Sequence, residues 1–92
     1  MKYGFAAAPS FRKALRKLNQ SQKQSAKKAY AIFKTDPFDP RLRTHKIHGL
    51  SARLGRTVYS VRVEGNLRAL FYLAKDTVVS MDIGDHRIYR DE

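Results

Sequence analysis

The sequence contains no cysteine, and this absence excludes both a disulfide framework and a zinc site built on thiolates. Long apolar runs are missing as well. The weakly apolar run between Gly4 and Pro9 is far shorter than a signal-peptide core or a membrane span. We therefore expect a cytoplasmic protein that is not inserted in a membrane.

Acidic residues are scarce, and none occurs before Asp36. The chain has 19 Lys and Arg against 8 Asp and Glu, a formal net charge of +11. Nine of the basic side chains fall within the first 35 residues. An excess of this size favours a nucleic acid, the ribosome, an anionic membrane or an acidic protein as partner.

The length limits the architecture to one domain, which we assign to residues 1–92. Hydrophobic residues make up 42% of the chain, enough for a modest core. A chain of this length buries only about 60–65% of its extended surface on folding. We therefore expect any site to be an open groove rather than an enclosed cavity.

The first 35 residues predict a short edge strand over Lys2 to Ala7 and then two helices. Ser10 is the expected N-cap of the first helix, whose apolar stripe is Phe11, Leu15 and Leu18. The pattern Ser21-Gln22-Lys23-Gln24 is typical of a capping box, so the second helix is expected from there to about Lys34. Such a short connection predicts an antiparallel helical hairpin, which Asp36-Pro37 and Asp39-Pro40 terminate.

The second half of the chain predicts a sheet, after a basic segment at 41–56 that has no clear periodicity. Apolar residues alternate over 57–64, and two further apolar segments, 67–74 and 77–83, follow as strands, each after a gap of two turn residues. Three consecutive strands form an antiparallel meander, and the helical hairpin is its only available cover. The sequence thus predicts an α+β domain: an N-terminal helical hairpin packed on a twisted antiparallel sheet, with the other face of the sheet free for function.

Three histidines flank this predicted sheet. His45 and His48 precede its first strand, and His86 follows its last, after Asp85. A metal site built from these residues is one possible use, but the neighbouring cations would repel a divalent ion. Those cations are Arg43, Lys46 and Arg87. We therefore expect no metal.

Two arginines suit a phosphodiester. Arg62 and Arg68 lie on consecutive strands around the Gly65-Asn66 turn, and arginine makes bidentate contacts with phosphate. A strict two-residue turn would pair Arg62 with Ala69 and leave Arg68 on the other face. A bulge or a longer turn would bring both guanidinium groups to one side.

The remaining chemical groups favour metal-free RNA cleavage. The sequence has no Gly-x-Ser-x-Gly, no phosphate-binding glycine loop and no cysteine nucleophile. Histidine, arginine, lysine and tyrosine suffice when the 2′-hydroxyl of the RNA attacks the neighbouring phosphate. In that reaction one group takes the 2′ proton, cations stabilise the phosphorane, and another group protonates the leaving oxygen.

An ordered set of motifs covers nearly the whole chain and resembles the RelE/ParE toxin superfamily. The set is Phe11-x3-Leu15-x2-Leu18, Asp36-Pro37, Arg43-x-His45-Lys46-Ile47-x-Gly49, Tyr59-Ser60-Val61-Arg62-Val63, Leu67-Arg68-Ala69-Leu70-Phe71-Tyr72 and Asp82-Ile83-Gly84-Asp85-His86-x2-Tyr89. The resemblance implies a RelE-like, microbial-RNase-like fold without a cofactor. RelE-like members cut mRNA in the ribosomal A site without a metal, and an antitoxin neutralises them by wrapping around the toxin.

The resemblance also implies roles for individual residues. Arg62 matches a basic catalytic residue, and Arg68 matches a phosphate-contacting arginine. His86 stands where members carry Arg or His, and Tyr89 where they carry an aromatic residue that acts as general acid or stacks on a base. His45 resembles the histidine that opens this segment in the YafQ-like branch.

Six further basic side chains are expected to contact RNA: Arg43, Lys46, His48, Arg53, Arg56 and Arg87. Two departures from the family pattern leave the identity of the general base and general acid open. Ser60 stands where RelE has a lysine, and Arg87 replaces an acidic or small residue.

Three functional hypotheses follow. The first is the toxin of a type II toxin–antitoxin system, a ribosome-dependent endoribonuclease with an antitoxin, the ribosome and mRNA as partners. The second is a non-enzymatic inhibitor of DNA gyrase like the ParE branch, against which His86 and Tyr89 argue. The third is an RNA-binding or antitoxin-binding module that has lost catalysis.

Overall fold

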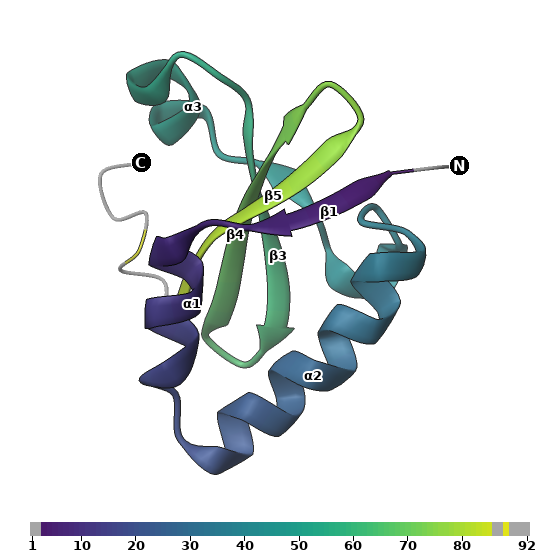
Figure 1. Ribbon diagram of the computed structural model, residues 1–92, viewed down its shortest axis with the longest axis vertical. Coiled ribbons are helices and arrows are strands. Elements are labelled where there is room, and N and C mark those ends of the chain that lie inside the picture. Colours follow the sequence, from purple (N-terminus) through teal and green to yellow (C-terminus); the bar gives the residue numbers. More distant parts are fainter. Residues whose placement is uncertain (1–2, 86–87, 89–92) are drawn as a thin grey trace.

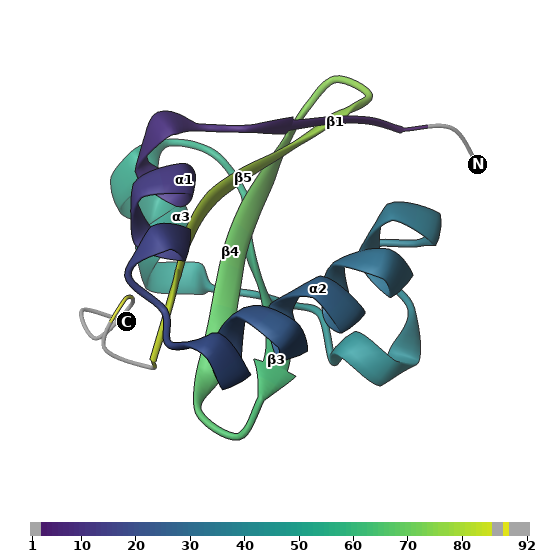
Figure 2. The same cartoon turned by 60° about the horizontal axis from the view of Figure 1, so that its bottom comes forward.

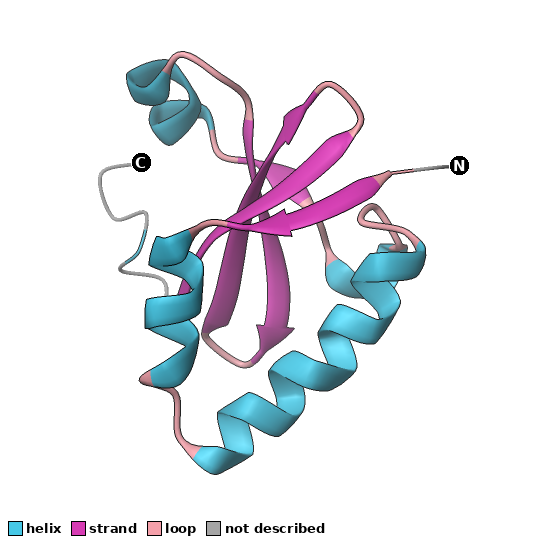
Figure 3. Cartoon of the chain, viewed as in Figure 1, coloured by secondary structure: helices cyan, strands magenta, loops and turns pink. Residues whose placement is uncertain are grey.

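The computed structural model describes residues 3–85 and 88 of the chain. A five-stranded sheet carries two helices on one face and a third, shorter helix on the other (Figures 1 and 3). The elements in chain order are β1 (Gly4–Ala7), α1 (Pro9–Arg16), α2 (Gln20–Thr35), the 3-10 helix η1 (Pro40–Leu42), β2 (His45–Lys46), α3 (His48–Leu54), β3 (Val58–Glu64), β4 (Leu67–Ala74) and β5 (Thr77–Gly84).

The sheet has the strand order β1-β5-β4-β3-β2. The antiparallel meander of β3, β4 and β5 confirms the prediction from the alternating pattern. The N-terminal strand is also confirmed, as an edge strand, but it runs parallel to β5, with Gly4 beside Thr77 and Ala7 beside Ser80. The α+β class is therefore confirmed, with a sheet that is mixed instead of purely antiparallel.

The face under α1 and α2 holds most of the core. Phe33 of α2 meets Phe71 of β4 edge to face, with ring centroids 5.1 Å apart, and Val61 and Val78 pack beside them. Phe11 of α1 packs in a second cluster that continues along the same face. Burial of these side chains holds the two helices on the sheet.

The α1 and α2 helices spread apart from their short linker and form an open V in place of the predicted antiparallel hairpin (Figure 1). Figure 2 shows α1 lying along β5 while α2 crosses near β3. Among the strands, α1 lies closest to β5 and α2 lies closest to β3. A cleft lies between the two helices as a result.

The two predicted helix starts were wrong in detail. The capping box at the start of α2 joins Asn19 and Gln22, two residues before the predicted pair: Gln22 N donates to Asn19 Oδ1 at 2.8 Å, and Asn19 N donates to Gln22 Oε1 at 3.0 Å. Ala8 is the N-cap of α1, with Pro9 at its first position. The Ser10 hydroxyl donates instead to Met81 O on β5 at 2.6 Å, which ties α1 to the sheet.

The opposite face of the sheet is only partly free, which corrects the expectation of an open face. The α3 helix lies in the segment that the sequence left unassigned, and it ends at Gly55 in the left-handed conformation. Its Leu50 packs with Ile47, Val58 and Leu70 in a third buried cluster. The end of this face near the β3–β4 turn remains outside that cluster and is available for a site.

Within the described residues, none of the helices combines the length and the apolar character needed to cross a membrane.

Candidate functional site

Arg62 and Arg68 lie opposite each other on neighbouring strands. The β3–β4 pairing joins Val61 to Ala69 and Arg62 to Arg68, and its register shifts between Arg62 and Glu64. Directly opposed residues of an antiparallel pair point to the same face. The bulge therefore brings both arginines to one side of the sheet, as the sequence predicted for a bulged turn and not for a strict two-residue turn.

The two guanidinium groups have different surroundings. Arg68 is half-buried, and its Nη1 donates to Gly65 O at 2.6 Å, which holds the side chain at the turn. Arg62 is exposed and borders a hollow of about 190 Å³ together with Lys28 of α2 and Arg41. One arginine is thus anchored and the other is available, and positive charge continues around the edge of β3.

His45 joins this face through β2. It pairs with Ser60 of β3, two residues before Arg62, so it shares the face of the two arginines. Diagonal neighbours of this kind are about 7–8 Å apart. The Nδ1 atom of the exposed His45 lies 3.1 Å from Arg43 O. Because a carbonyl oxygen only accepts, Nδ1 carries the hydrogen, and Nε2 is the basic nitrogen of the neutral ring.

The C-terminal end of β5 lies beside Arg68. Gly84 pairs with Arg68, and Ile88 packs against the cluster of Ile47, Leu50 and Val58. Three predicted site residues follow Gly84 in this part of the chain and lie outside the described residues: His86, Arg87 and Tyr89.

The other expected RNA contacts are distributed around this face. His48 begins α3, Arg53 lies in its last turn, and Arg56 follows it, with its guanidinium 4.2 Å from the centre of the Tyr72 ring. Arg43 adopts the left-handed conformation just before β2. Lys46 pairs with Tyr59, so it shares the opposite face, and the structure does not bring it together with Arg62 and Arg68.

Asp82 is a site candidate that the sequence analysis missed. It pairs with Leu70 on β5 and so shares the face of Arg62 and Arg68. Burial raises the pKa of this half-buried carboxyl, while the Ile83 backbone N–H, which donates to Asp82 Oδ1 at 2.9 Å, opposes that shift. The only signal in the sequence was an acid within a strand pattern that otherwise alternates apolar residues.

Ser60 lies on the same face of the sheet as Arg62, and it is buried. Its side chain is 0% exposed, and its Oγ has no hydrogen-bond partner within the described part of the chain. Ser51, also buried, contrasts with it: the Ser51 hydroxyl donates to Ile47 O at 2.6 Å and accepts from Val58 N at 2.8 Å. The Ser60 side chain is therefore enclosed in the protein.

Among the described residues, no three side chains of His, Cys, Asp or Glu gather in a way that could hold a metal ion. The face instead combines two arginines, one histidine and one half-buried carboxyl. Such a group can bind a phosphate and exchange a proton near it.

No family model and no curated protein sequence matches the chain. Solved structures match over nearly its full length. A RelE–RelB complex from Pyrococcus horikoshii matches with a TM-score of 0.69 and 17% identity, over 92% of this chain and 96% of that one. A DinJ–YafQ complex from E. coli matches at 0.62 and 14%, over 96% and 98%. A metal-bound toxin from Helicobacter pylori matches at 0.64 and 14%, over 96% and 99%. The chain therefore has the fold of RelE-like toxins.

Proposed function

We propose that this chain is the toxin of a type II toxin–antitoxin system and that it cleaves mRNA on the ribosome without a metal or other cofactor. The observation that carries the proposal is the pairing of Arg62 with Arg68, with His45 on the same face of the fold. The similar structures include RelE with RelB and YafQ with DinJ, which supports an antitoxin as the protein partner. We place the protein in the cytoplasm, where ribosomes and mRNA are found.

The proposed reaction uses the RNA's own nucleophile. The 2′-hydroxyl oxygen attacks the adjacent phosphorus, its proton passes to a base, and the bond to the leaving 5′-oxygen breaks as that oxygen gains a proton. The products are a 2′,3′-cyclic phosphate and a 5′-hydroxyl end. No oxidant, metal or additional co-reactant is needed.

Each residue on the face has a place in this reaction. His45 Nε2 is our candidate base, since Nδ1 already carries its hydrogen. Arg62 and Arg68 stabilise the charge that develops on the phosphorane. His86 is our candidate acid, and Tyr89 our candidate for stacking on a base; both assignments rest on the family resemblance and on chain proximity to Gly84.

The proposed cleavage requires the ribosome. The face is open, and Arg62 is exposed. An open face cannot by itself hold the scissile phosphate in line with the 2′-hydroxyl, which is where most of the advantage of a bound geometry arises. Free RNA is therefore expected to be a poor substrate.

A cleavage assay with purified protein tests this. The protein is added to ribosomes that hold a defined mRNA with an empty A site, and to the same mRNA alone. We expect cleavage in the A-site codon only with ribosomes, and none when the nucleotide 5′ to the scissile phosphate lacks its 2′-hydroxyl. Intact mRNA on the ribosome, or cleavage of the 2′-deoxy substrate, contradicts the proposal.

A further inference from the structure

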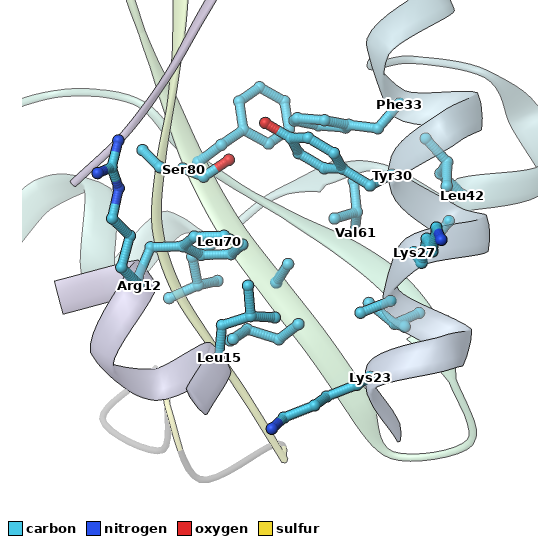
Figure 4. Close-up of a pocket in the computed structure, with 18 of the residues that line it drawn as sticks. Arg12, Leu15, Lys23, Lys27, Tyr30, Phe33, Leu42, Val61, Leu70 and Ser80 are labelled. Atoms are coloured by element: carbon cyan, nitrogen blue, oxygen red, sulfur yellow. The ribbon is translucent and has the colours of Figure 1, made fainter. Parts of the chain in front are cut away.

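A β-bulge in β5 sets the direction of the Asp82 side chain. The pairing of β5 with β4 passes from Ser80 directly to Asp82 and leaves out Met81. Ser80 lines the apolar cleft between α1 and α2, which Figure 4 shows. Because side chains alternate along a strand, a regular β5 would turn Asp82 toward that cleft as well. The extra residue turns Asp82 to the opposite face of the sheet, and bulges that redirect a side chain in this way are frequent next to functional sites.

Asp82 is the only acid on this face among the strand residues that the structure describes. The other acidic strand residue, Glu64, pairs with Leu67 and accepts a hydrogen bond from Ser25 of α2, so it lies on the side of the helices. The face of Asp82 also carries Arg68, and no ion pair joins the two side chains. A single carboxylate therefore stands on a face whose other charged strand residues are cationic.

The surroundings of the Asp82 carboxyl are apolar. Leu70, which pairs with it, is buried, and Ile88 lies over Gly84, two residues further along β5. The half-buried carboxyl accepts one hydrogen bond through Oδ1, from the Ile83 backbone N–H at 2.9 Å, and Oδ2 has no such partner among the described residues. A partly desolvated carboxylate with free acceptor sites costs stability, and a ligand that donates hydrogen bonds to it recovers that cost.

The carboxyl lies close to the proposed phosphate-binding arginines. Arg68 pairs with Gly84, so Asp82 is its diagonal neighbour on the same face. Diagonal neighbours are about 7–8 Å apart, which is about two steps of a stacked nucleic-acid strand at 3.4 Å each. A strand with a phosphate on Arg68 thus brings the base of a nearby nucleotide to Asp82, while the negative charge of Asp82 keeps phosphates away from this position.

We infer that Asp82 is a specificity-determining residue that binds the Watson–Crick edge of a guanine in single-stranded RNA. A carboxylate only accepts hydrogen bonds. Guanine presents two adjacent donors, N1–H and the 2-amino group, to its two oxygens. Adenine and cytosine present one amino group beside an acceptor nitrogen, and uracil presents one N–H between two carbonyl oxygens. Bases of single-stranded RNA are commonly recognised at this edge. That the ligand is RNA rests on the proposed function above, whereas the direction of the carboxyl rests on the bulge.

Equilibrium binding of the full-length chain to four labelled RNAs tests the role of Asp82. Each RNA is a short 2′-O-methyl uridine oligomer with G, A, C or U at its centre, and the methyl groups remove the nucleophile that cleavage needs. The RNA with guanine should bind at least about tenfold more tightly than the other three, as expected for one bidentate base contact. Inosine, which lacks the 2-amino group, should lose most of this advantage. By contrast, 7-deazaguanine keeps the Watson–Crick edge and should retain it.

Asp82→Asn should abolish the preference for guanine, because an amide offers one acceptor and one donor in place of two acceptors. Its affinity for the other three RNAs should stay equal or rise, since a negative charge has left the face. A purely structural role of Asp82 would instead lower all four affinities together. The matched control, Asp76→Asn, makes the same change in charge in the exposed turn at the other end of β5 and should keep the preference.

Three results would overturn the assignment of Asp82. The first is equal binding, or no binding, of the four RNAs by the wild-type chain. The second is a guanine preference that survives in Asp82→Asn. The third is a preference that is lost with 7-deazaguanine, because the contact would then lie on the other edge of the base. None of these RNAs can be cleaved, so failure of the nuclease proposal and failure of this assignment are separate outcomes.

Discussion

Arg62 and Arg68 face each other across β3 and β4 in a directly opposed pair. Like charges in this position destabilise a sheet, by about 0.2–1 kcal/mol relative to neutral pairs. Neither arginine has an acidic partner in an ion pair within the described residues. The pair is therefore unfavourable for the free protein and becomes favourable when an anion lies between the two groups.

The first prediction separates stability from activity at this pair. Arg62→Gln should leave the free energy of unfolding unchanged or raise it by up to about 1 kcal/mol. The same variant should lower the rate of mRNA cleavage on ribosomes by about 10²–10³, the usual effect of removing one electrostatic donor. Denaturant titration and the ribosome assay measure the two effects.

Arg16→Gln is the control for this variant, because it removes one exposed guanidinium from α1 on the other face of the sheet. Its cleavage rate should stay close to that of the wild type. Equal losses in Arg62→Gln and Arg16→Gln would mean that net charge, and not the arginine pair, determines the rate.

The second prediction compares the two buried serines. Ser51→Ala removes a hydroxyl that bonds to Ile47 O and Val58 N and should lower the free energy of unfolding by about 1–3 kcal/mol. Ser60→Ala removes a buried hydroxyl that has no hydrogen-bond partner among the residues that the structure describes, and it should leave that free energy unchanged or raise it by about 1 kcal/mol. Urea titration of both variants tests the contrast, and a larger loss in Ser60→Ala would show that its Oγ does find a partner.

The third prediction concerns pH. Because burial raises the pKa of Asp82 above its ordinary value of 3.8, the folded chain binds this proton more tightly than the unfolded chain. The associated stability is present below pH 3.8 and is lost as the pH rises through the raised pKa. At neutral pH the ionised, half-buried Asp82 carboxylate therefore lowers the free energy of unfolding.

Asp82→Asn should accordingly raise the Tm at pH 7, and its Tm should converge with that of the wild type as the pH falls below 3.8. Its amide oxygen can still accept from the Ile83 N–H. Asp76→Asn, in the exposed turn between β4 and β5, makes the same change in charge and should leave the Tm at pH 7 close to that of the wild type. A lower Tm for Asp82→Asn at pH 7 would mean that the carboxylate is stabilised by a charge on this face.

The fourth prediction concerns the contact between Gly84 and Ile88. A Cβ added at Gly84 would lie 2.7 Å from Ile88 Cγ2, too close for two carbon atoms. Gly84→Ala should therefore lower the free energy of unfolding by about 1–3 kcal/mol. In an Ile88→Ala background the same substitution should be neutral or slightly stabilising, since alanine suits a strand better than glycine does. Additive effects in this double-mutant cycle would show that Ile88 does not pack on Gly84.

The sequence predicted those elements whose periodicity is dictated by burial. Alternation over 57–64 and the two apolar segments that follow it, separated by turn residues, defined the meander. The capping box was predicted at Ser21–Gln24, whereas the structure has it at Asn19–Gln22, because the Asn19 side chain also accepts a hydrogen bond from a glutamine three residues later. The α3 helix has no side-chain N-cap, so only Leu50 and Leu54, four residues apart, and the Gly55 C-cap signalled it.

The site depends on features that a one-dimensional pattern does not contain. The alternation continues through Val63, so nothing in it shows whether the register of β3 shifts there. The divergence of α1 and α2 arises from their packing on separate strands, and the cleft between them is a tertiary consequence. The acid-free composition of residues 9–35 was visible in the sequence, but its arrangement around an apolar cleft was not.

Mapping of mRNA 5′ ends in cells after induction of the protein shows whether the chain cuts mRNA. We predict that wild-type protein arrests growth and generates new 5′-hydroxyl ends within translated codons. His45→Gln should reduce those ends by about 10²–10⁴, the usual contribution of a general base. Growth arrest with intact transcripts would mean that the chain does not act by cleaving mRNA.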